Sequence, residues 1–101
     1  MIKLKSDDQN EITGAQIRAA RAVLRWSAKD LAANASIGVA TISRAESEDG
    51  IPSTTAANLK AIRRAFEDHG IQFSSDVSGR VGLNFDHRAD YAAANEKFSS
   101  E

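Results

Sequence analysis

The chain of 101 residues contains no cysteine, one proline and one tryptophan. Without cysteine it has no disulfide, no thiolate metal ligand and no cysteine nucleophile, a composition that suits a reducing cytoplasm. No run of about eighteen apolar residues is present to span a membrane, and the charged first residues have no apolar signal-peptide core. We therefore expect a cytoplasmic, globular, single-domain protein with one modest core and no membrane partner.

An excess of charge of either sign is also missing, because the formal net charge is −1 at pH 7. A basic patch is the usual electrostatic signature of a nucleic-acid-binding protein, so this balance is unusual for that class. The charges are unevenly distributed, however. Between residues 13 and 70 eight cations outnumber six anions, whereas both ends of the chain are acidic. The middle of the chain is therefore mildly basic.

Residue groups typical of catalysis or metal binding are lacking as well. The two histidines, His69 and His87, have no neighbouring nucleophile or metal ligand in the sequence. The acid pairs at residues 7–8 and 48–49 fall in expected loops, where carboxylates are usually solvated. Residues 79–82 contain two glycines but no strand-to-helix phosphate loop. The sequence thus predicts no enzyme, no metal site, no cofactor and no small-ligand site.

The most informative stretch is residues 27–46, SAKDLAANASIGVATISRAE. Its apolar residues follow helical spacing in two groups with a break between them, which favours two short helices over one. Ser27 can cap a helix that begins at Ala28, with Asp30 completing a capping box. The middle of the stretch holds three residues that tolerate turns or caps, Asn34, Ser36 and Gly38. We expect the second helix from about Val39 to Glu46.

A further helix is expected before this pair. Thr13 and Gln16 have the spacing of a capping box, and the alanine-rich run that follows predicts a helix ending near Arg25. Trp26 then lies between two helices, and we interpret it as a core residue because a lone aromatic in that place is usually buried. The alternative, a base-stacking or partner-binding Trp26, stays open.

Another helix is expected after the pair, from about Thr55 to His69, with Gly70 as its stop. Residues 47–52 form the loop that precedes it. Arg63 and Arg64 fall on the polar side of this helix, where a solvated face is the simpler interpretation and contact with a partner is the alternative.

Residues 71–85 read as a β-hairpin. Residues 71–73 and 81–85 alternate apolar and polar side chains, and a turn-rich segment separates them. A lone hairpin is marginal in water, so it needs a second surface, either its own helical domain or the same hairpin in another subunit.

Both ends of the chain lie outside the expected domain at residues 13–70. Residues 1–12 are polar and predict a flexible arm. Residues 86–101 form an acidic, alanine-rich tail in which Tyr91, Ala94 and Phe98 would share one face of a short helix capped by Asp86. The tail is either a partner-binding arm or partly disordered.

The pair of helices at residues 28–46 resembles the helix-turn-helix of the Cro and phage-repressor type, the XRE family. Ala32 stands at the small, close-packed position, Ile42 at the core position, and residues 41–46, TISRAE, are the most family-like segment. Ser36 departs from the usual glycine, and Ala28 from the usual phosphate-binding glutamine. The resemblance covers roughly residues 13 to 73. It implies a mainly α, compact four- to five-helix lambda-repressor-like domain with a C-terminal β-hairpin.

The resemblance also implies a function: sequence-specific binding of double-stranded DNA by a homodimeric transcriptional regulator, expected to be a repressor, with residues 71–85 as a possible dimerisation element. The second motif helix would enter the major groove, with base contacts from Gly38, Val39, Ala40, Ser43 and Arg44. Phosphates would be held by Ser27, Lys29, Thr41, Ser53, Thr54 and Thr55. A partly buried structural ion pair between Arg21 and Glu46 is implied as well, because these two residues occupy the family's matching positions.

A protein-interaction module, such as an antitoxin or antiactivator, is the competing class. A helix-turn-helix fold does not require DNA binding. The near-neutral charge and the apolar start of the second helix, at Val39 and Ala40, would suit a protein surface. Salt-sensitive DNA binding that Arg44→Ala abolishes would separate the two classes, because an interaction module would keep its partner through that change.

Overall fold

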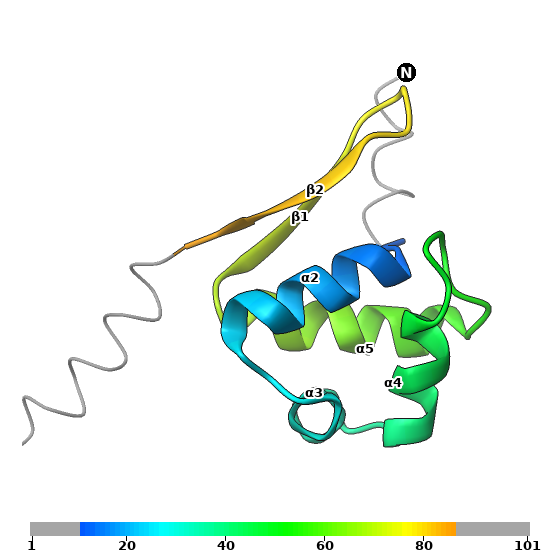
Figure 1. Ribbon diagram of the computed structural model, residues 1–101, viewed down its shortest axis with the longest axis vertical. Helices are drawn as coiled ribbons and strands as arrows, with labels where there is room; N and C mark the ends of the chain where they lie inside the picture. The colour runs from blue at the N-terminus through cyan, green and yellow to red at the C-terminus, as the bar shows by residue number, and fades with distance from the viewer. Residues whose placement is uncertain (1–10, 87–101) are drawn as a thin grey trace, which may run out of the picture.

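The computed structural model describes residues 11–86, which form four helices followed by a two-stranded antiparallel hairpin (Figure 1). The elements are α2 (Gly14–Leu24), α3 (Ala28–Ala35), α4 (Val39–Glu46), α5 (Ala56–Glu67), β1 (Ile71–Ser75) and β2 (Val81–Phe85). The described chain is therefore mainly α and ends in a hairpin, as expected. Residues 1–10 of the arm expected at 1–12 and the expected helix of the tail lie outside the described residues. None of the described helices is long and apolar enough to cross a membrane.

Local caps explain where the helices begin. At α2 the Gln16 N–H donates to Thr13 Oγ1 (3.1 Å) and the Thr13 N–H donates to Gln16 Oε1 (2.9 Å). Ser27 and Asp30 make the same reciprocal pair at α3, at 3.0 and 2.8 Å. Each box satisfies main-chain donors that the helix itself leaves without partners. The Thr55 hydroxyl likewise accepts from the main chain at the start of α5, and α5 ends at Glu67, two residues earlier than expected.

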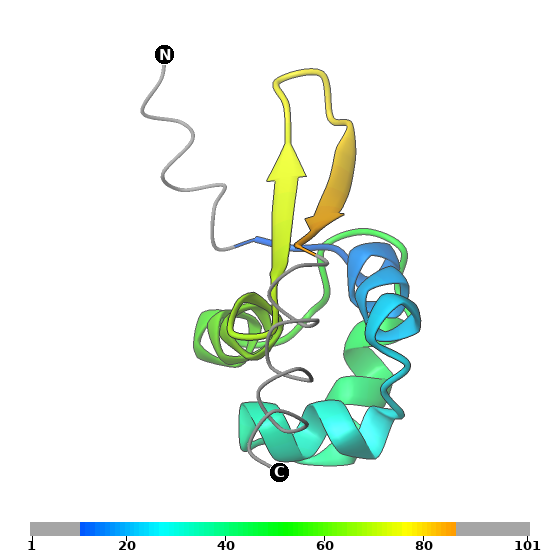
Figure 2. The same cartoon turned by 90° about the vertical axis from the view of Figure 1, so that its left-hand side faces the viewer.

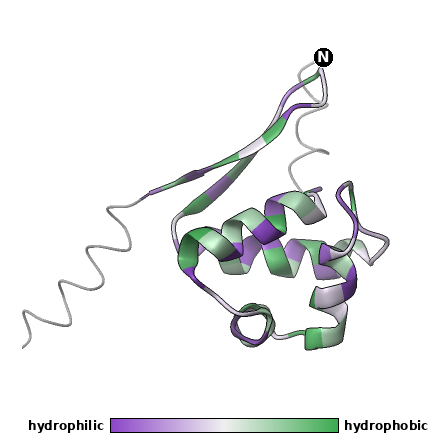
Figure 3. Cartoon of the chain, in the orientation of Figure 1, coloured by the Kyte–Doolittle hydropathy of each residue, from purple (hydrophilic) through white to green (hydrophobic). Residues whose placement is uncertain are grey.

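The apolar faces of the four helices meet in one core. Its fully buried large side chains are Ile12, Ile17, Leu31, Ile42, Ile62, Phe66 and Ile71. Polar and apolar segments alternate along the helices, as the purple and green bands show in Figure 3. Ile12 belongs to this cluster, so the expectation that the flexible arm extends to residue 12 was wrong. Ile12 is completely buried, and burying its side chain stabilises the core. The packed domain therefore begins at least one residue before Thr13, the N-cap of α2.

The hairpin rests on the helices at its base and projects beyond them at its tip (Figures 1 and 2). Phe73, Leu83 and Phe85 pack against the core. The Gln16 Nε2 group donates to the carbonyl oxygens of Ser74 (3.2 Å) and Gly82 (2.8 Å), one on each strand. The hairpin therefore finds a second surface in its own helical domain. Strand β1 also continues to Ser75, two residues further than the alternation of residues 71–73 predicts.

Aromatic rings close the core beneath the hairpin. Trp26 stacks on Phe66 with ring centroids 5.5 Å apart and meets the His69 ring edge to face at 4.8 Å. This packing supports the core interpretation of Trp26. Arg63 donates to Glu67 (2.8 Å) and lies over the Phe73 ring, with only 14% of its side chain exposed. The expected solvated face was therefore wrong for Arg63, since its stem and guanidinium cover the aromatic cluster.

Candidate nucleic-acid interface

A three-residue turn joins α3 to α4. Ser36 has a left-handed conformation (φ 59°, ψ 42°), and its N–H and that of Ile37 donate to the Ala32 carbonyl. Gly38 then returns to extended geometry as the N-cap of α4. A left-handed conformation costs a residue with a side chain about 1 to 2 kcal/mol, so Ser36 carries a backbone strain that a glycine would avoid.

Helix α4 has one buried and one exposed side. Ile42, Ala45 and Glu46 are buried. The five residues expected to contact bases are all exposed, and they run from the N-cap of α4 to its last turn: Gly38, Val39, Ala40, Ser43 and Arg44. Val39 is 41% exposed, which is high for a large apolar side chain. The first turn of α4 is accordingly green in Figure 3.

Most of the residues expected to hold phosphates are exposed as well. Ser27, Lys29, Ser53 and Thr55 are exposed, whereas Thr41 and Thr54 are partly buried. Several of the hydroxyls already accept a hydrogen bond: Thr55 from the Asn58 N–H (3.1 Å) and Thr54 from Asn58 Nδ2 (3.0 Å). A hydroxyl that accepts one bond can still donate its proton to an anion. These caps therefore remain chemically able to bind a phosphate oxygen.

The ion pair between Arg21 and Glu46 is present. Arg21 Nε lies 2.6 Å from Glu46 Oε2, and Nη2 lies 2.9 Å from Oε1, which makes a two-point contact between α2 and the end of α4. Arg21 Nη1 also donates to the Trp26 carbonyl at 2.8 Å. The hydrogen bonds that the Arg21 guanidinium donates to the Glu46 carboxylate raise the pKa of Arg21. The pair fixes the buried end of α4, while its exposed start remains open to a partner.

Arg18 adds a second link between α2 and α4 that our sequence analysis missed. Its guanidinium donates to the Glu46 main-chain carbonyl and to Asp49 Oδ1, the latter at 2.6 Å. Arg18 precedes Arg21 by three residues, so the two arginines share a helix face. That spacing was the available signal. The end of α4 is therefore held by two arginines of one helix, and Arg18 also holds the loop that follows it.

Gly14 is a second structural residue that the sequence did not single out. Its N–H donates to the Gly50 carbonyl (2.9 Å), and a Cβ atom at this position would lie 1.8 Å from the Glu48 carbonyl oxygen. The start of α2 and the loop after α4 are thus in direct main-chain contact. Only glycine leaves room for so close an approach.

Comparisons with protein-family models and with curated proteins give no match. Within residues 11–86 no group of three or more histidine, aspartate or glutamate side chains is arranged to hold a metal ion. The arrangement that the described chain offers is an exposed helix start, flanked in sequence by hydroxyl groups and one lysine, on a rigid helical base.

Proposed function

We propose that the protein is a sequence-specific DNA-binding transcriptional regulator of the Cro and phage-repressor helix-turn-helix type, expected to be a repressor. It is built on a lambda-repressor-like domain and acts as a homodimer. The observation that carries the proposal is the asymmetry of α4. Its inner side is locked to the core through Ile42 and to α2 through Glu46, while its first residues are presented to solvent.

The readout of bases would rest on few side chains. Arg44 can donate two hydrogen bonds to guanine O6 and N7, and the methyl groups of Val39 and Ala40 suit the methyl group of thymine. Ser43 is the other side chain among the five that can hydrogen-bond. Because the expected phosphate contacts include a single cation, Lys29, we expect a shallow dependence of affinity on salt and weak binding by one protomer. Because one protomer would bind weakly and gain little from phosphate charges, we expect two protomers to bind two half-sites as a dimer.

The hairpin is the element that we assign to dimerisation. The Asp76 N–H donates to the Arg80 carbonyl, and the Asp86 N–H donates to the Gly70 carbonyl. These two bonds show which opposed residue pairs of the hairpin are hydrogen-bonded to each other. The alternate pairs, such as Phe73 and Leu83, then direct their main-chain groups toward the outer edges of the hairpin. Such edges pair readily with another strand. Beyond the helices the hairpin also exposes Val81 (45%) and Val77 (92%), which a second copy would cover.

The test is a titration of the full chain against the DNA upstream of its own gene, at about 50 and 200 mM salt, with the molecular mass in solution recorded. Arg44→Ala is the informative variant, because loss of a bidentate base contact costs about 1 to 3 kcal/mol. Arg64→Ala is the matched control, since Arg64 is also exposed in the last turn of a helix, α5. We expect salt-weakened binding by a dimer that Arg44→Ala removes and Arg64→Ala preserves.

The absence of DNA binding at both salt concentrations would overturn the proposal. It would favour the protein-interaction module instead, for which the exposed Val39 at the start of α4 is the specific supporting observation. In that case a partner protein would bind the same helix, and its binding would survive Arg44→Ala.

A further inference from the structure

The second strand of the hairpin has a sequence that is complementary to itself. Residues 80–86, RVGLNFD, begin with a cation and end with an anion, and no other charge lies between them. When two copies of this segment run antiparallel with Leu83 opposite itself, Arg80 of each copy lies opposite the partner's Asp86. Opposite charges that face each other across two strands stabilise the pairing, and like charges destabilise it.

The hydrogen bonds of the hairpin allow this alignment. Strands β1 and β2 bond to each other through their even-numbered residues, so Val81, Leu83 and Phe85 direct their N–H and C=O groups toward the outer edge of β2. With Leu83 opposite itself, these three residues bond to the same three residues of a second copy. A slide of two residues in either direction would shorten the overlap and separate Arg80 from the partner's Asp86.

The side chains on both faces of the hairpin fit the same alignment. Val81 is at the end of the face that packs on the helices, and it is 45% exposed. The partner's Phe85 would lie directly opposite Val81 and cover it. On the other face Gly82 would lie opposite the partner's Asn84, so a residue without a side chain leaves room for a larger one.

The exposed side of α2 lies near the same edge. Figure 2 shows β2 above α2 and β1 above α5, in agreement with the contacts of the two strands. Apart from Arg18, which bonds to the end of α4, the exposed residues of α2 are small or apolar: Ala19, Ala22 and Val23. A two-fold axis through Leu83 would place the two copies of α2 side by side, and side chains of this size permit a close approach.

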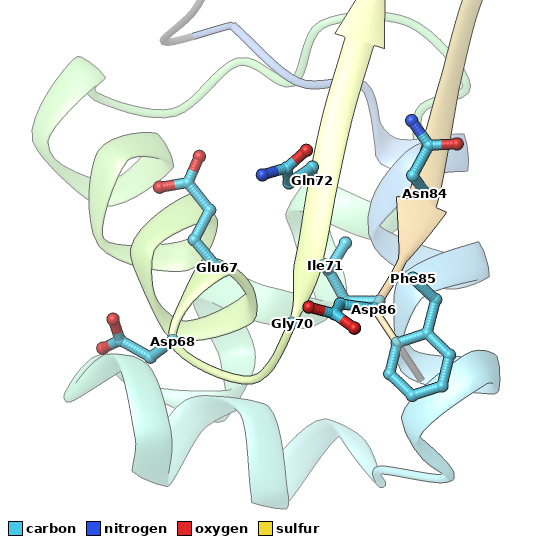
Figure 4. A pocket seen from close by; sticks show the side chains of 8 residues that line it. All are labelled: Glu67, Asp68, Gly70, Ile71, Gln72, Asn84, Phe85 and Asp86. Atoms are coloured by element: carbon cyan, nitrogen blue, oxygen red, sulfur yellow. The ribbon is translucent and has the colours of Figure 1, made fainter. Parts of the chain in front are cut away.

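The edge of β1 is not complementary to itself. Antiparallel pairing with Phe73 opposite itself would bring the partner's Asp76 next to the end of α5. There Glu67 and Asp68 line a cavity of about 580 Å³ beside the base of β1 (Figure 4). Arg63 pairs with Glu67 at 2.8 Å, so Asp68 and the partner's Asp76 are the like charges that would be brought together. This repulsion favours the edge of β2 over that of β1.

We propose that two copies of this chain join through β2, antiparallel and with Leu83 on the two-fold axis, so that Arg80 of each copy binds the partner's Asp86. The inference rests on the homodimer of the proposed function and adds its strand, its register and the contact between the two α2 helices. The two hairpins then form one four-stranded sheet with the β2 strands at its centre. None of the residues assigned to bases or phosphates takes part, so the dimer can be measured without DNA.

The test is sedimentation equilibrium of the full chain with exchanged charges. Arg80→Glu alone, or Asp86→Arg alone, places like charges opposite each other at both ends of the interface, and each should raise the Kd of the dimer about tenfold. An equal mixture of the two variants should recover the affinity of the unmodified chain, because both pairs are then restored with their signs exchanged. Arg64→Glu is the control, since Arg64 is exposed on α5 and its replacement changes the net charge as Arg80→Glu does.

A second measurement uses one introduced cysteine in a chain that has none of its own. Leu83→Cys puts two thiols on the proposed axis. Phe73→Cys is the matched control, because Phe73 is opposite Leu83 in the hairpin and is also partly buried. Opposed residues of a hydrogen-bonded pair have Cα atoms about 5.5 Å apart, within the range of a disulfide. Under mild oxidation we expect Leu83→Cys to form linked dimers about tenfold faster than Phe73→Cys, with circular dichroism to verify that both variants are folded.

Faster linkage by Phe73→Cys would overturn the proposal, because it would place the edge of β1 on the axis. A mixture of the two charge variants that binds no more tightly than either variant alone would also overturn it, while the homodimer of the proposed function would stand. An unmodified chain that sediments as a monomer at every concentration would overturn both.

Discussion

A Cβ atom on Gly14 would lie 1.8 Å from the carbonyl oxygen of Glu48 and 2.6 Å from that of Ala45, so α2 touches the main chain at the end of α4 with no side chain between them. The N–H of Gly14 also donates to the Gly50 carbonyl. Together with the Arg21–Glu46 pair, this contact makes α2 the support on which α4 is mounted.

The close approach predicts that Gly14→Ala destabilises the fold, although alanine normally favours a helix by about 0.5 to 1 kcal/mol over glycine. The obstructing atoms belong to the main chain and cannot rotate away, so we expect a cost of about 1 to 3 kcal/mol. Thermal unfolding measures it. Gly50→Ala is the matched control, because a Cβ there meets nothing within 4 Å. Equal melting temperatures for the two variants would contradict the predicted contact.

The two ion pairs of α2 should differ in their contribution to stability. The side chains of Arg21 and Glu46 are 25% and 10% exposed, whereas those of Arg18 and Asp49 are 42% and 88% exposed. Glu46→Ala leaves a guanidinium largely buried without its partner, which costs about 3 to 5 kcal/mol for a fully buried pair and somewhat less here. Asp49→Ala should cost no more than about 1 kcal/mol. Denaturant unfolding of both variants tests the order, and an unchanged midpoint for Glu46→Ala would show that the pair is energetically unimportant.

Ser36→Gly should stabilise the protein, because glycine adopts the left-handed conformation of the turn without strain. The greater freedom of glycine in the unfolded chain offsets part of this gain, which leaves about 1 kcal/mol or a rise in Tm of about 4 to 8 °C. Ser43→Gly provides the comparison within α4, where the same replacement should lower stability by about 0.5 kcal/mol. Shifts of the same sign in both variants would argue against strain at Ser36.

The turn at the tip of the hairpin should respond to acid. Hydrogen bonds from the Arg80 N–H (2.9 Å) and the Ser78 hydroxyl (2.8 Å) lower the pKa of Asp76 below its ordinary value. Because the folded pKa is below the unfolded one, the carboxylate stabilises the turn above about pH 4, and this contribution is lost as the pH falls through the folded value. Amide hydrogen exchange at Ser78 and Arg80 measures the effect. Asp76→Asn should show no such acid response, and an equal response in both proteins would exclude Asp76 as its source.

The sequence was most informative where structure depends on near neighbours. The boxes at Thr13 and Ser27 involve partners three residues away, so the starts of α2 and α3 could be predicted to the residue. The bounds of α4 followed in the same way, from apolar spacing and from the turn residues. The left-handed strain at Ser36 was expected from the resemblance instead, because the family usually has a glycine there. The exposure of α4 was predictable once its buried residues were known, because the two sides of a helix are complementary.

Contacts between distant segments were much less predictable. Gln16 appeared only as a capping residue, but its amide also joins two strands 58 and 66 residues further along the chain. The strand β1 continues through Ser74 and Ser75. Both side chains are polar, so the alternation of apolar and polar residues that indicates a strand stops at residue 73. The roles of Gly14 and Ile12 depend on contacts with segments that are distant in the sequence. The spacing of apolar residues along the chain does not reveal such contacts.

The bond network around Gln16 has a consequence for DNA spacing. Gln16 ties the hairpin to α2, and Arg21 ties α2 to α4, so one short helix fixes the angle between the proposed dimer contact and the proposed reading helix. In a dimer joined by its hairpins, α2 would set the distance between the two copies of α4. The separation of the two half-sites would be set by this internal geometry, and Gln16→Ala would broaden the range of operator spacings that the protein accepts.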